Sequence, residues 1–347
     1  MGPVVAEPEA ILVKGQRPLV ARAVNAKPEG RDAVVRLQIF LDEKLYGPGF
    51  IDGKAGNFTT RAAYAYSRAK GRSPDAWDAL MRDVEAQLGE TYATAVVPEI
   101  ASEYVNPNLP RSRAAQAEFK QMSYRSYYEF MAERYHTSED FLIELNDKSK
   151  VWGMKPRDAI VVPNVEPFLI EEFKSGRTWG EDPGLSDRTV IIDTNSNQIF
   201  VYGPGSGPAV TGTNAATIIV EDEEEEAGAH RKLLAVFPIT PGKRQFIHHG
   251  EWKIKNMVAF PTWGYDQQFL DTGVRSPRSE VLQIPGGPNN PIGVIWCGLT
   301  KSGIGIHGTS SPRTIGRSVS AGCIRLSNWD AGRFPNLVRP GAKAVIR

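Results

Sequence analysis

A helical period marks the first part of the chain. Between residues 31 and 45, aliphatic side chains recur at offsets of three, four and four, the spacing of one helix face: Val34, Leu37, Leu41 and Leu45. The pattern predicts a helix over Arg31–Leu45. A second helix is expected to run to Lys70, capped by Asn57 or Thr59, with Gly71 just beyond its end.

A second short unit follows after residue 120. Tyr128–Thr137 has helical character, and Ser138 is a suitable N-cap for another helix over Glu139–Leu145. Val161–Asn164 is then expected to form a short strand after a Pro-containing turn. This order predicts a small α+β unit.

The remainder of the chain is rich in strand signals. Thr189–Asp193 and Gln198–Tyr202 bracket a turn at 194–197, which predicts a hairpin. Strand character returns at Lys232–Ile239 and Glu251–Lys255. The acidic run Glu221–Glu226 between these segments is expected to be solvated, and its role is not predicted.

Length and charge limit the function classes. A chain of 347 residues exceeds one average domain, and 41 basic against 40 acidic side chains leave a net charge of +1, which does not call for a nucleic-acid partner. No apolar run reaches the roughly 18 residues of a membrane helix. The first residues also lack the basic and apolar regions of a secretion signal.

The chemistry concentrates in two short motifs, His307-Gly308-Thr309 and Ser320-Ala321-Gly322-Cys323-Ile324-Arg325. A free thiol, with a pKa of about 8.5, is only slightly ionised at neutral pH and needs a base to act as a nucleophile. His307, sixteen residues before Cys323, would be that base. The alternative is a structural thiol and a structural histidine. The pair predicts acyl transfer through a thioester.

These motifs resemble the signature of the L,D-transpeptidases, the YkuD-type enzymes of bacterial cell walls. The resemblance extends over Ile284–Gly293 and Val190–Tyr202, and so over most of residues 186–347. It implies that Cys323 attacks a tetrapeptide stem of peptidoglycan and that an amine of a second stem resolves the thioester, giving a 3→3 cross-link. Water as acceptor would give an L,D-carboxypeptidase, and a wall protein as acceptor would be anchored. A non-catalytic wall-binding protein is the alternative from another class.

The resemblance also assigns site roles. Cys323 and His307 would be catalytic, with the ring of His307 oriented by the carbonyl of Gly308. The N–H groups of Gly322 and Cys323 would form the oxyanion hole. Four further residues are predicted to contact substrate: Arg325, Ser320, Thr309 and Trp263. Arg325 would either hold a stem-peptide carboxylate or brace its own loop. The substrate-facing loop Pro241–Gly250 departs from the family pattern.

The N-terminal part resembles two wall-binding modules. Residues 37–62 are similar to a small helical peptidoglycan-binding domain, on a pattern that includes Tyr46, Pro48-Gly49 and Ile51-Asp52-Gly53. Residues 121–168 are similar to a LysM module, although its usual opening turn is replaced by Ser126-Tyr127-Tyr128. Both imply glycan or stem-peptide partners, but whether either module binds the wall is left open.

The predicted fold is therefore multidomain, with a β-rich mixed-sheet catalytic domain of L,D-transpeptidase type after a small helical domain and a small α+β module. The predicted order is an arm or linker at 1–30, the helical domain at 31–95, a linker at 96–120, the LysM-like module at 121–168, a linker at 169–185 and the catalytic domain at 186–347. A wall enzyme acts outside the cytoplasm, so we expect a periplasmic or wall-associated protein whose export signal is absent from this chain.

No cofactor or metal is predicted. His248, His249 and Asp266 lack the spacing of metal ligands and are expected to be loop residues. Cys297 lies in an apolar strand-like run, and is expected to be a small buried hydrophobe or the partner of Cys323 in a regulatory disulfide. The oligomeric state is not predicted.

Overall fold

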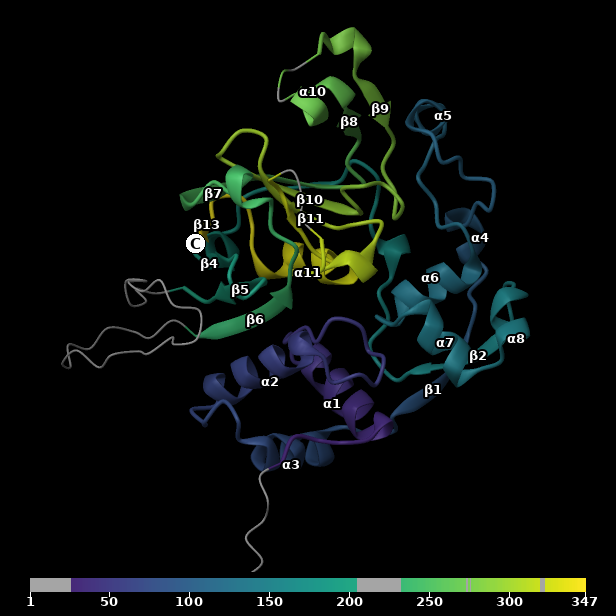
Figure 1. Ribbon diagram of the computed structural model, residues 1–347, viewed down its shortest axis with the longest axis vertical. Coiled ribbons are helices and arrows are strands. Elements are labelled where there is room, and N and C mark those ends of the chain that lie inside the picture. The colour runs from purple at the N-terminus through teal and green to yellow at the C-terminus, as the bar shows by residue number, and fades with distance from the viewer. Residues whose placement is uncertain (1–25, 205–231, 273, 275, 319–321) are drawn as a thin grey trace, which may run out of the picture.

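The computed structural model describes residues 26–204, 232–272, 274, 276–318 and 322–347 (Figure 1). Within them, the C-terminal part forms one mixed sheet in the order β12-β11-β10-β7-β13-β4-β5-β6, with β3 paired to β7. Its strands are β3 (Thr178–Trp179), β4 (Thr189–Asp193), β5 (Gln198–Tyr202), β6 (Leu233–Pro238), β7 (Gly250–Ala259), β10 (Ile295–Leu299), β11 (Gly305–His307), β12 (Ile324–Arg325) and β13 (Lys343–Ile346). The predicted hairpin β4–β5 is confirmed, with Asp193 opposite Gln198.

The two ends of this sheet meet. Just beyond β6, Thr240 pairs with Arg325 of β12, and each N–H donates to the other residue's carbonyl at 3.0 Å. This bridge curls the sheet and places the segment after β6 beside the Cys323 motif. The loop Pro241–Gly250, which is predicted to face substrate, therefore begins next to β12, the strand that follows Cys323.

Helices and neighbouring units cover both faces of the sheet, which is why β4 is buried along its whole length. Val190 and Ile192 lie in the main core, together with α11 (Asn328–Leu337). Ile191 points the other way and packs in a second core, with the N-terminal helices. The strand thus links two cores.

Three helices form the first N-terminal unit: α1 (Arg31–Glu43), α2 (Asn57–Ala69) and α3 (Trp77–Gln87). They lie against the outer side of β4, β5 and β6 (Figure 1). The predicted helix over Arg31–Leu45 ends two residues early, because the chain turns at Leu45 and its carbonyl accepts from Val236 N–H of β6 at 2.8 Å.

The predicted cap of α2 is wrong. Gly56 is the N-cap, in extended conformation and without a side-chain bond. Asn57 begins the helix, and the hydroxyl of Thr59 is buried, where it accepts from Gln38 Nε2 at 3.2 Å. Because the Thr59 hydroxyl is buried against α1 and binds Gln38, it does not cap the helix. The predicted end holds, since Gly71 follows Lys70 with φ at 68°.

The second N-terminal unit is closed by an antiparallel pair, β1 (Tyr92–Val96) and β2 (Ala159–Pro163). Between these strands lie α6 (Tyr127–Arg134), α7 (Glu139–Leu145) and α8 (Lys148–Trp152). The predicted cap of α7 is confirmed, because Ser138 Oγ accepts from Phe141 N–H at 3.1 Å.

The predicted boundary at residue 95 falls inside β1, whose paired residues in β2 lie 63 to 71 positions later. The sequence of a five-residue strand does not indicate which distant strand it pairs with. The prediction therefore grouped these residues with the preceding helices. The predicted linker 96–120 contains two short helices, α4 (Ala101–Tyr104) and α5 (Arg113–Ala117).

A lobe beside the sheet is built from β8 (Trp263–Tyr265), α10 (Gln267–Thr272) and β9 (Leu282–Ile284). Leu109 and Met122 of the long β1–α6 connection pack against Ile284 of this lobe. The remaining short helical turns are η1 (Ile170–Glu172), α9 (Pro183–Ser186), η2 (Arg244–Phe246), η3 (Arg278–Glu280) and η4 (Pro312–Thr314). None of the described helices is long and apolar enough to cross a membrane.

Some predictions lie outside the described residues. They concern most of the N-terminal arm 1–30, the acidic run Glu221–Glu226 and the motif residues Ser320 and Ala321.

Candidate active site

Strand pairing gathers the reactive side chains on one face of the sheet. In the parallel pair β11–β12, His307 lies opposite Arg325. Paired residues point to the same face, and Cys323 precedes Arg325 by two positions, the period of a strand. The imidazole and the guanidinium therefore belong to one face, and the spacing indicates the same face for the thiol, which directly precedes β12.

Cys297 belongs to the opposite face. It pairs with Ile306, which pairs with Ile324, and these side chains point into the main core. Neither cysteine forms a disulfide in the described part of the chain, and Cys297 is 1% exposed. Burial raises the pKa of the Cys297 thiol well above its ordinary value. The structure thus gives Cys297 the role of a small core hydrophobe and separates it from Cys323 by the sheet itself.

The ring of His307 has a fixed tautomer. Nδ1 lies 2.6 Å from the carbonyl oxygen of Gly308. A carbonyl can only accept, so Nδ1 carries the proton and Nε2 is the basic nitrogen. The indole of Trp296 stacks on the imidazole with the ring centroids 5.6 Å apart. Backbone and indole together hold the ring in one orientation.

Burial controls the charge of His307. It lowers the pKa of the imidazole to about 4; the bond to Gly308 acts in the opposite direction, and the positive charge of Arg325 lowers the pKa further. At neutral pH the ring is therefore uncharged and able to accept a proton. The sequence did not indicate this value.

Cys323 is partly exposed, and its Sγ–H donates to Gly303 O at 3.5 Å. Burial raises the pKa of this thiol, while the Gly305 N–H and the charge of Arg325 act to lower it. Thiol and imidazole are thus both neutral at rest. The arrangement favours removal of the thiol proton during attack over a standing thiolate–imidazolium pair.

Arg325 has an unusual environment for a guanidinium. Its Nε is buried without a hydrogen-bond partner, and it forms no ion pair with a carboxylate in the described part of the chain. Burial lowers the pKa of Arg325, which the neighbouring Cys323 partly offsets. Among the described residues, no carboxylate compensates the burial of this cation.

The backbone at the thiol is closely packed. Gly322 has φ at 119°, a conformation that side chains rarely adopt. A Cβ on Gly242 would lie 2.6 Å from the Cα of Gly322, so only glycine fits on the facing loop. Phe246, further along that loop, is 43% exposed. The loop Pro241–Gly250 therefore covers the Cys323 segment directly.

The other predicted site residues are placed less directly. Thr309 is buried, and its hydroxyl accepts from Ser311 N–H at 3.2 Å, which organises the turn after Gly308. Trp263 lies on β8, next to Tyr265 and under the guanidinium of Arg113 at 5.4 Å. Their contacts with substrate stay predictions.

His248 and Asp266 form hydrogen bonds with neighbouring protein groups. Trp252 Nε1 donates to His248 O at 3.0 Å, and Asp266 accepts from Ser276 through both carboxylate oxygens. No group of three or more potential metal ligands occurs among the described residues.

Sequence reasoning missed two residues near the site. Asn328 lies two positions after Leu326 of the cysteine motif, and its amide contacts the backbone next to His307. Its closeness to the motif was a usable signal. Glu133, which binds Asn328, is 195 positions away along the chain, and no local pattern could have indicated it.

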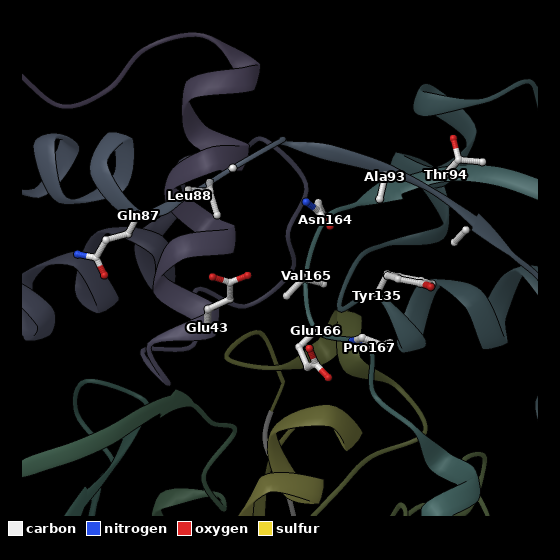
Figure 2. A pocket seen from close by; sticks show the side chains of 12 residues that line it. Glu43, Gln87, Leu88, Ala93, Thr94, Tyr135, Asn164, Val165, Glu166 and Pro167 are labelled. Carbon is white, nitrogen blue, oxygen red and sulfur yellow. The ribbon is translucent and has the colours of Figure 1, made fainter.

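A separate pocket of about 400 Å³ lies between the two N-terminal units (Figure 2). Glu43 of α1 and Glu166 after β2 both line it. Burial raises the pKa of Glu43, and the negative charges of Asp42 and Glu166 raise it further. Neither the thiol of Cys323 nor the imidazole of His307 lines this pocket.

Known proteins resemble the C-terminal part of this chain. Residues 187–346 match the family model YkuD, described as the L,D-transpeptidase catalytic domain. The putative L,D-transpeptidase YkuD of Bacillus licheniformis is 39% identical over 74 residues, which cover 21% of this chain and 45% of the relative. The probable L,D-transpeptidase ErfK/SrfK of Escherichia coli is 31% identical over 115 residues, covering 32% and 36%.

The chain thus spans less than half the length of the curated relatives it matches. Among solved structures, an L,D-transpeptidase from Mycobacterium smegmatis aligns with a TM-score of 0.31 at 17% identity, covering 55% of this chain and 74% of that one.

Proposed function

We propose that this protein is a cysteine-dependent L,D-transpeptidase that joins peptidoglycan stems by 3→3 cross-links, since residues 187–346 match the family model described as the L,D-transpeptidase catalytic domain. The observation that carries the proposal is the shared face of Cys323, His307 and Arg325. It combines a thiol, a neutral imidazole and a guanidinium that forms no ion pair with any described carboxylate.

In the first half-reaction, Cys323 Sγ attacks a peptide carbonyl of a tetrapeptide stem, and His307 Nε2 accepts the thiol proton. The N–H groups of Gly322 and Cys323 stabilise the oxyanion. The peptide C–N bond then breaks, and His307 returns the proton to the nitrogen of the departing D-alanine. A thioester on Cys323 remains.

In the second half-reaction, an amine of another stem attacks the thioester carbonyl, and His307 accepts its proton. The C–S bond breaks, the proton returns to sulfur, and the new peptide bond is the cross-link. Arg325 would pair with a carboxylate of the stem peptide, which its buried and unpartnered Nε supports over a bracing role.

A muropeptide assay tests the reaction. The protein is mixed with a purified tetrapeptide-stem muropeptide, and products are followed by mass spectrometry. Cross-linked dimer supports the proposal, whereas tripeptide alone indicates an L,D-carboxypeptidase. Dimer formation that persists in Cys323→Ala would exclude the thioester mechanism. If neither product forms, a non-catalytic wall-binding protein becomes the better account.

We also place the reaction in the periplasm or cell wall, where its substrate is found, and propose that the two N-terminal units contact the wall. Sedimentation of the Cys323→Ala protein with insoluble peptidoglycan tests wall contact without turnover. Protein left in the supernatant at all peptidoglycan concentrations contradicts it. Fractionation of cells that produce the full gene product tests the location.

A further inference from the structure

A buried carboxylate from the second N-terminal unit reaches the catalytic domain. Glu133 lies on α6 and is 7% exposed. Tyr124 Oη donates to its Oε1 at 2.5 Å. Asn328 Nδ2, at the start of α11, donates to Oε1 and Oε2 at 3.0 and 3.2 Å. Both oxygens of Glu133 thus accept hydrogen bonds, and those from Asn328 join the second N-terminal unit to the C-terminal domain.

Asn328 is held in one amide orientation by this contact. Its Nδ2 donates to Glu133 and to Pro288 O at 3.2 Å, while its Oδ1 accepts from Val294 N–H at 3.1 Å. An amide flip would set Nδ2 against the N–H group of Val294 and Oδ1 against the carbonyl oxygen of Pro288. Both pairings are repulsive, so Glu133, Pro288 and Val294 together determine which atom faces the site.

The oriented amide is in tight contact with the residue that orients the base. A Cβ on Gly308 would lie 2.2 Å from Asn328 Oδ1, so the amide fits only because this residue is glycine. Gly308 N–H donates to Ile295 O at 3.1 Å, and its carbonyl accepts from His307 Nδ1 at 2.6 Å. A shift of Asn328 would therefore move the carbonyl that sets the tautomer of His307.

We propose that Glu133 is a positioning residue of the active site: through Asn328 it fixes the Gly308 carbonyl and so keeps the proton of His307 on Nδ1. An element outside the catalytic domain thereby completes its active site. The consequence for turnover rests on the proposed transpeptidase function. The consequence for the tautomer does not.

The environment of Glu133 supports a specific role for its oxygens. Burial raises the pKa of Glu133 to about 8, whereas the hydrogen bonds from Tyr124 and Asn328 lower it and the charge of Glu129 raises it. Such burial is unfavourable for a carboxylate, and an apolar side chain of similar volume would avoid that cost. What an apolar side chain cannot provide is an acceptor for Asn328.

The test compares Glu133→Leu with Glu133→Gln in the full chain. Leucine removes both acceptor oxygens at similar volume, while glutamine can still present one oxygen to Asn328 Nδ2. We expect Glu133→Leu to lower kcat at least about tenfold with KM within about twofold, and Glu133→Gln to recover most of that loss. Nitrogen NMR on histidine-labelled protein should show the Nδ1–H form of His307 in the wild type and a tautomer mixture in Glu133→Leu.

Glu129→Leu is the matched control. Glu129 lies on the same helix and accepts from Asn289 Nδ2 at 3.0 Å, but it has no contact with Asn328. The tautomer of His307 should be unchanged in this variant. A folded Glu133→Leu protein with the wild-type tautomer and kcat would overturn the proposal, and so would a Glu129→Leu protein with the same tautomer shift.

If Glu133→Leu does not fold, a reversed pair provides the test. Asn328→Asp alone opposes two buried carboxylates and should disturb His307. Adding Glu133→Gln restores a donor–acceptor pair and should return the Nδ1–H signal; no recovery in the double variant overturns the proposal. Wild-type protein without turnover would count against the proposed function alone, since the NMR signal is read independently of activity.

Discussion

At the scale of single residues, the thiol of Cys323 and the imidazole of His307 are both neutral at pH 7. Burial raises the pKa of Cys323 and lowers that of His307 to about 4. Both shifts favour the uncharged form of the group. In the proposed reaction, the proton of the Cys323 thiol therefore moves to His307 while the sulfur attacks the substrate. This has consequences for reactivity and for pH dependence.

The first prediction concerns alkylation of Cys323. Because its pKa is raised, the fraction of thiolate at neutral pH is smaller than in a free thiol, and reaction with iodoacetamide should be slower than that of a model thiol and increase with pH. Mass spectrometry of the intact protein follows the adduct. Cys297 should react only after unfolding, and Cys323→Ala should remain unlabelled when native. Rapid labelling at pH 6 would indicate a standing thiolate instead.

The second prediction concerns the acid limb of the pH–rate profile. His307 must be neutral to accept the thiol proton, and its lowered pKa keeps it neutral down to about pH 4. We therefore expect kcat/KM to stay level between pH 7 and 5.5, measured with the muropeptide assay. A limb near pH 6.5, the ordinary value for histidine, would contradict the assignment.

At the scale of elements, α1, α6 and α11 meet in a buried charge network. Asp42 of α1 accepts two bonds from Arg333 of α11, at 3.1 and 2.6 Å, and one from His136 Nδ1 at 2.9 Å. His136 follows α6 and stacks on Trp329 with the ring centroids 5.6 Å apart. Burial alone would raise the pKa of Asp42, but the charges and hydrogen bonds of Arg333 and His136 bring it well below its ordinary range.

The third prediction follows from this network. Asp42→Ala leaves the Arg333 guanidinium buried without its carboxylate, so we expect a loss of about 3–5 kcal/mol in the free energy of unfolding. Urea unfolding followed by circular dichroism measures it. Asp83→Ala serves as control, since it breaks the more exposed pair with Arg72 and should cost about 1 kcal/mol or less. Equal losses in the two variants would show that the network adds nothing specific.

A fourth prediction concerns stability at alkaline pH. The pKa values of Glu133 and Asp330 are raised by burial, to about 8 and about 7, above their unfolded values near 4. Their protonated forms favour the folded state below pH 4, and this contribution is lost as the pH rises through 7 and 8. The melting temperature should therefore fall between pH 6 and 9. In Glu133→Gln the fall should be shallower; an unchanged slope would contradict the assignment for Glu133.

At the scale of the whole molecule, the N-terminal units are not tethered modules. The main core runs without interruption from Ala95 and Phe130 to Ile346, and α1–α3 cover the outer faces of Ile191, Phe200 and Val236. The catalytic domain depends on both units for the burial of its own apolar surface.

The fifth prediction is that the fragment 187–346 does not behave as an independent domain. Its excision exposes the face of the sheet that packs in the second core and leaves Arg333 without Asp42. Each large apolar side chain that becomes exposed costs about 1.5–3 kcal/mol of folding free energy. We expect poor solubility, binding of a hydrophobic dye and a lowered melting temperature relative to the full chain. A cooperative melt at the temperature of the full protein would contradict this dependence.

The features that could be predicted from the sequence were local. The hairpin 189–202, the cap at Ser138 and the helix pattern before Leu45 all depend on residues close together along the chain, whose propensities and turn chemistry act without distant partners. Tertiary structure alone decided the rest: the partner of β1, the bridge from Thr240 to Arg325, the lowered pKa of His307 and the reach of Glu133 to Asn328. These features depend on burial and on contacts between distant segments, which exist only once the cores have formed.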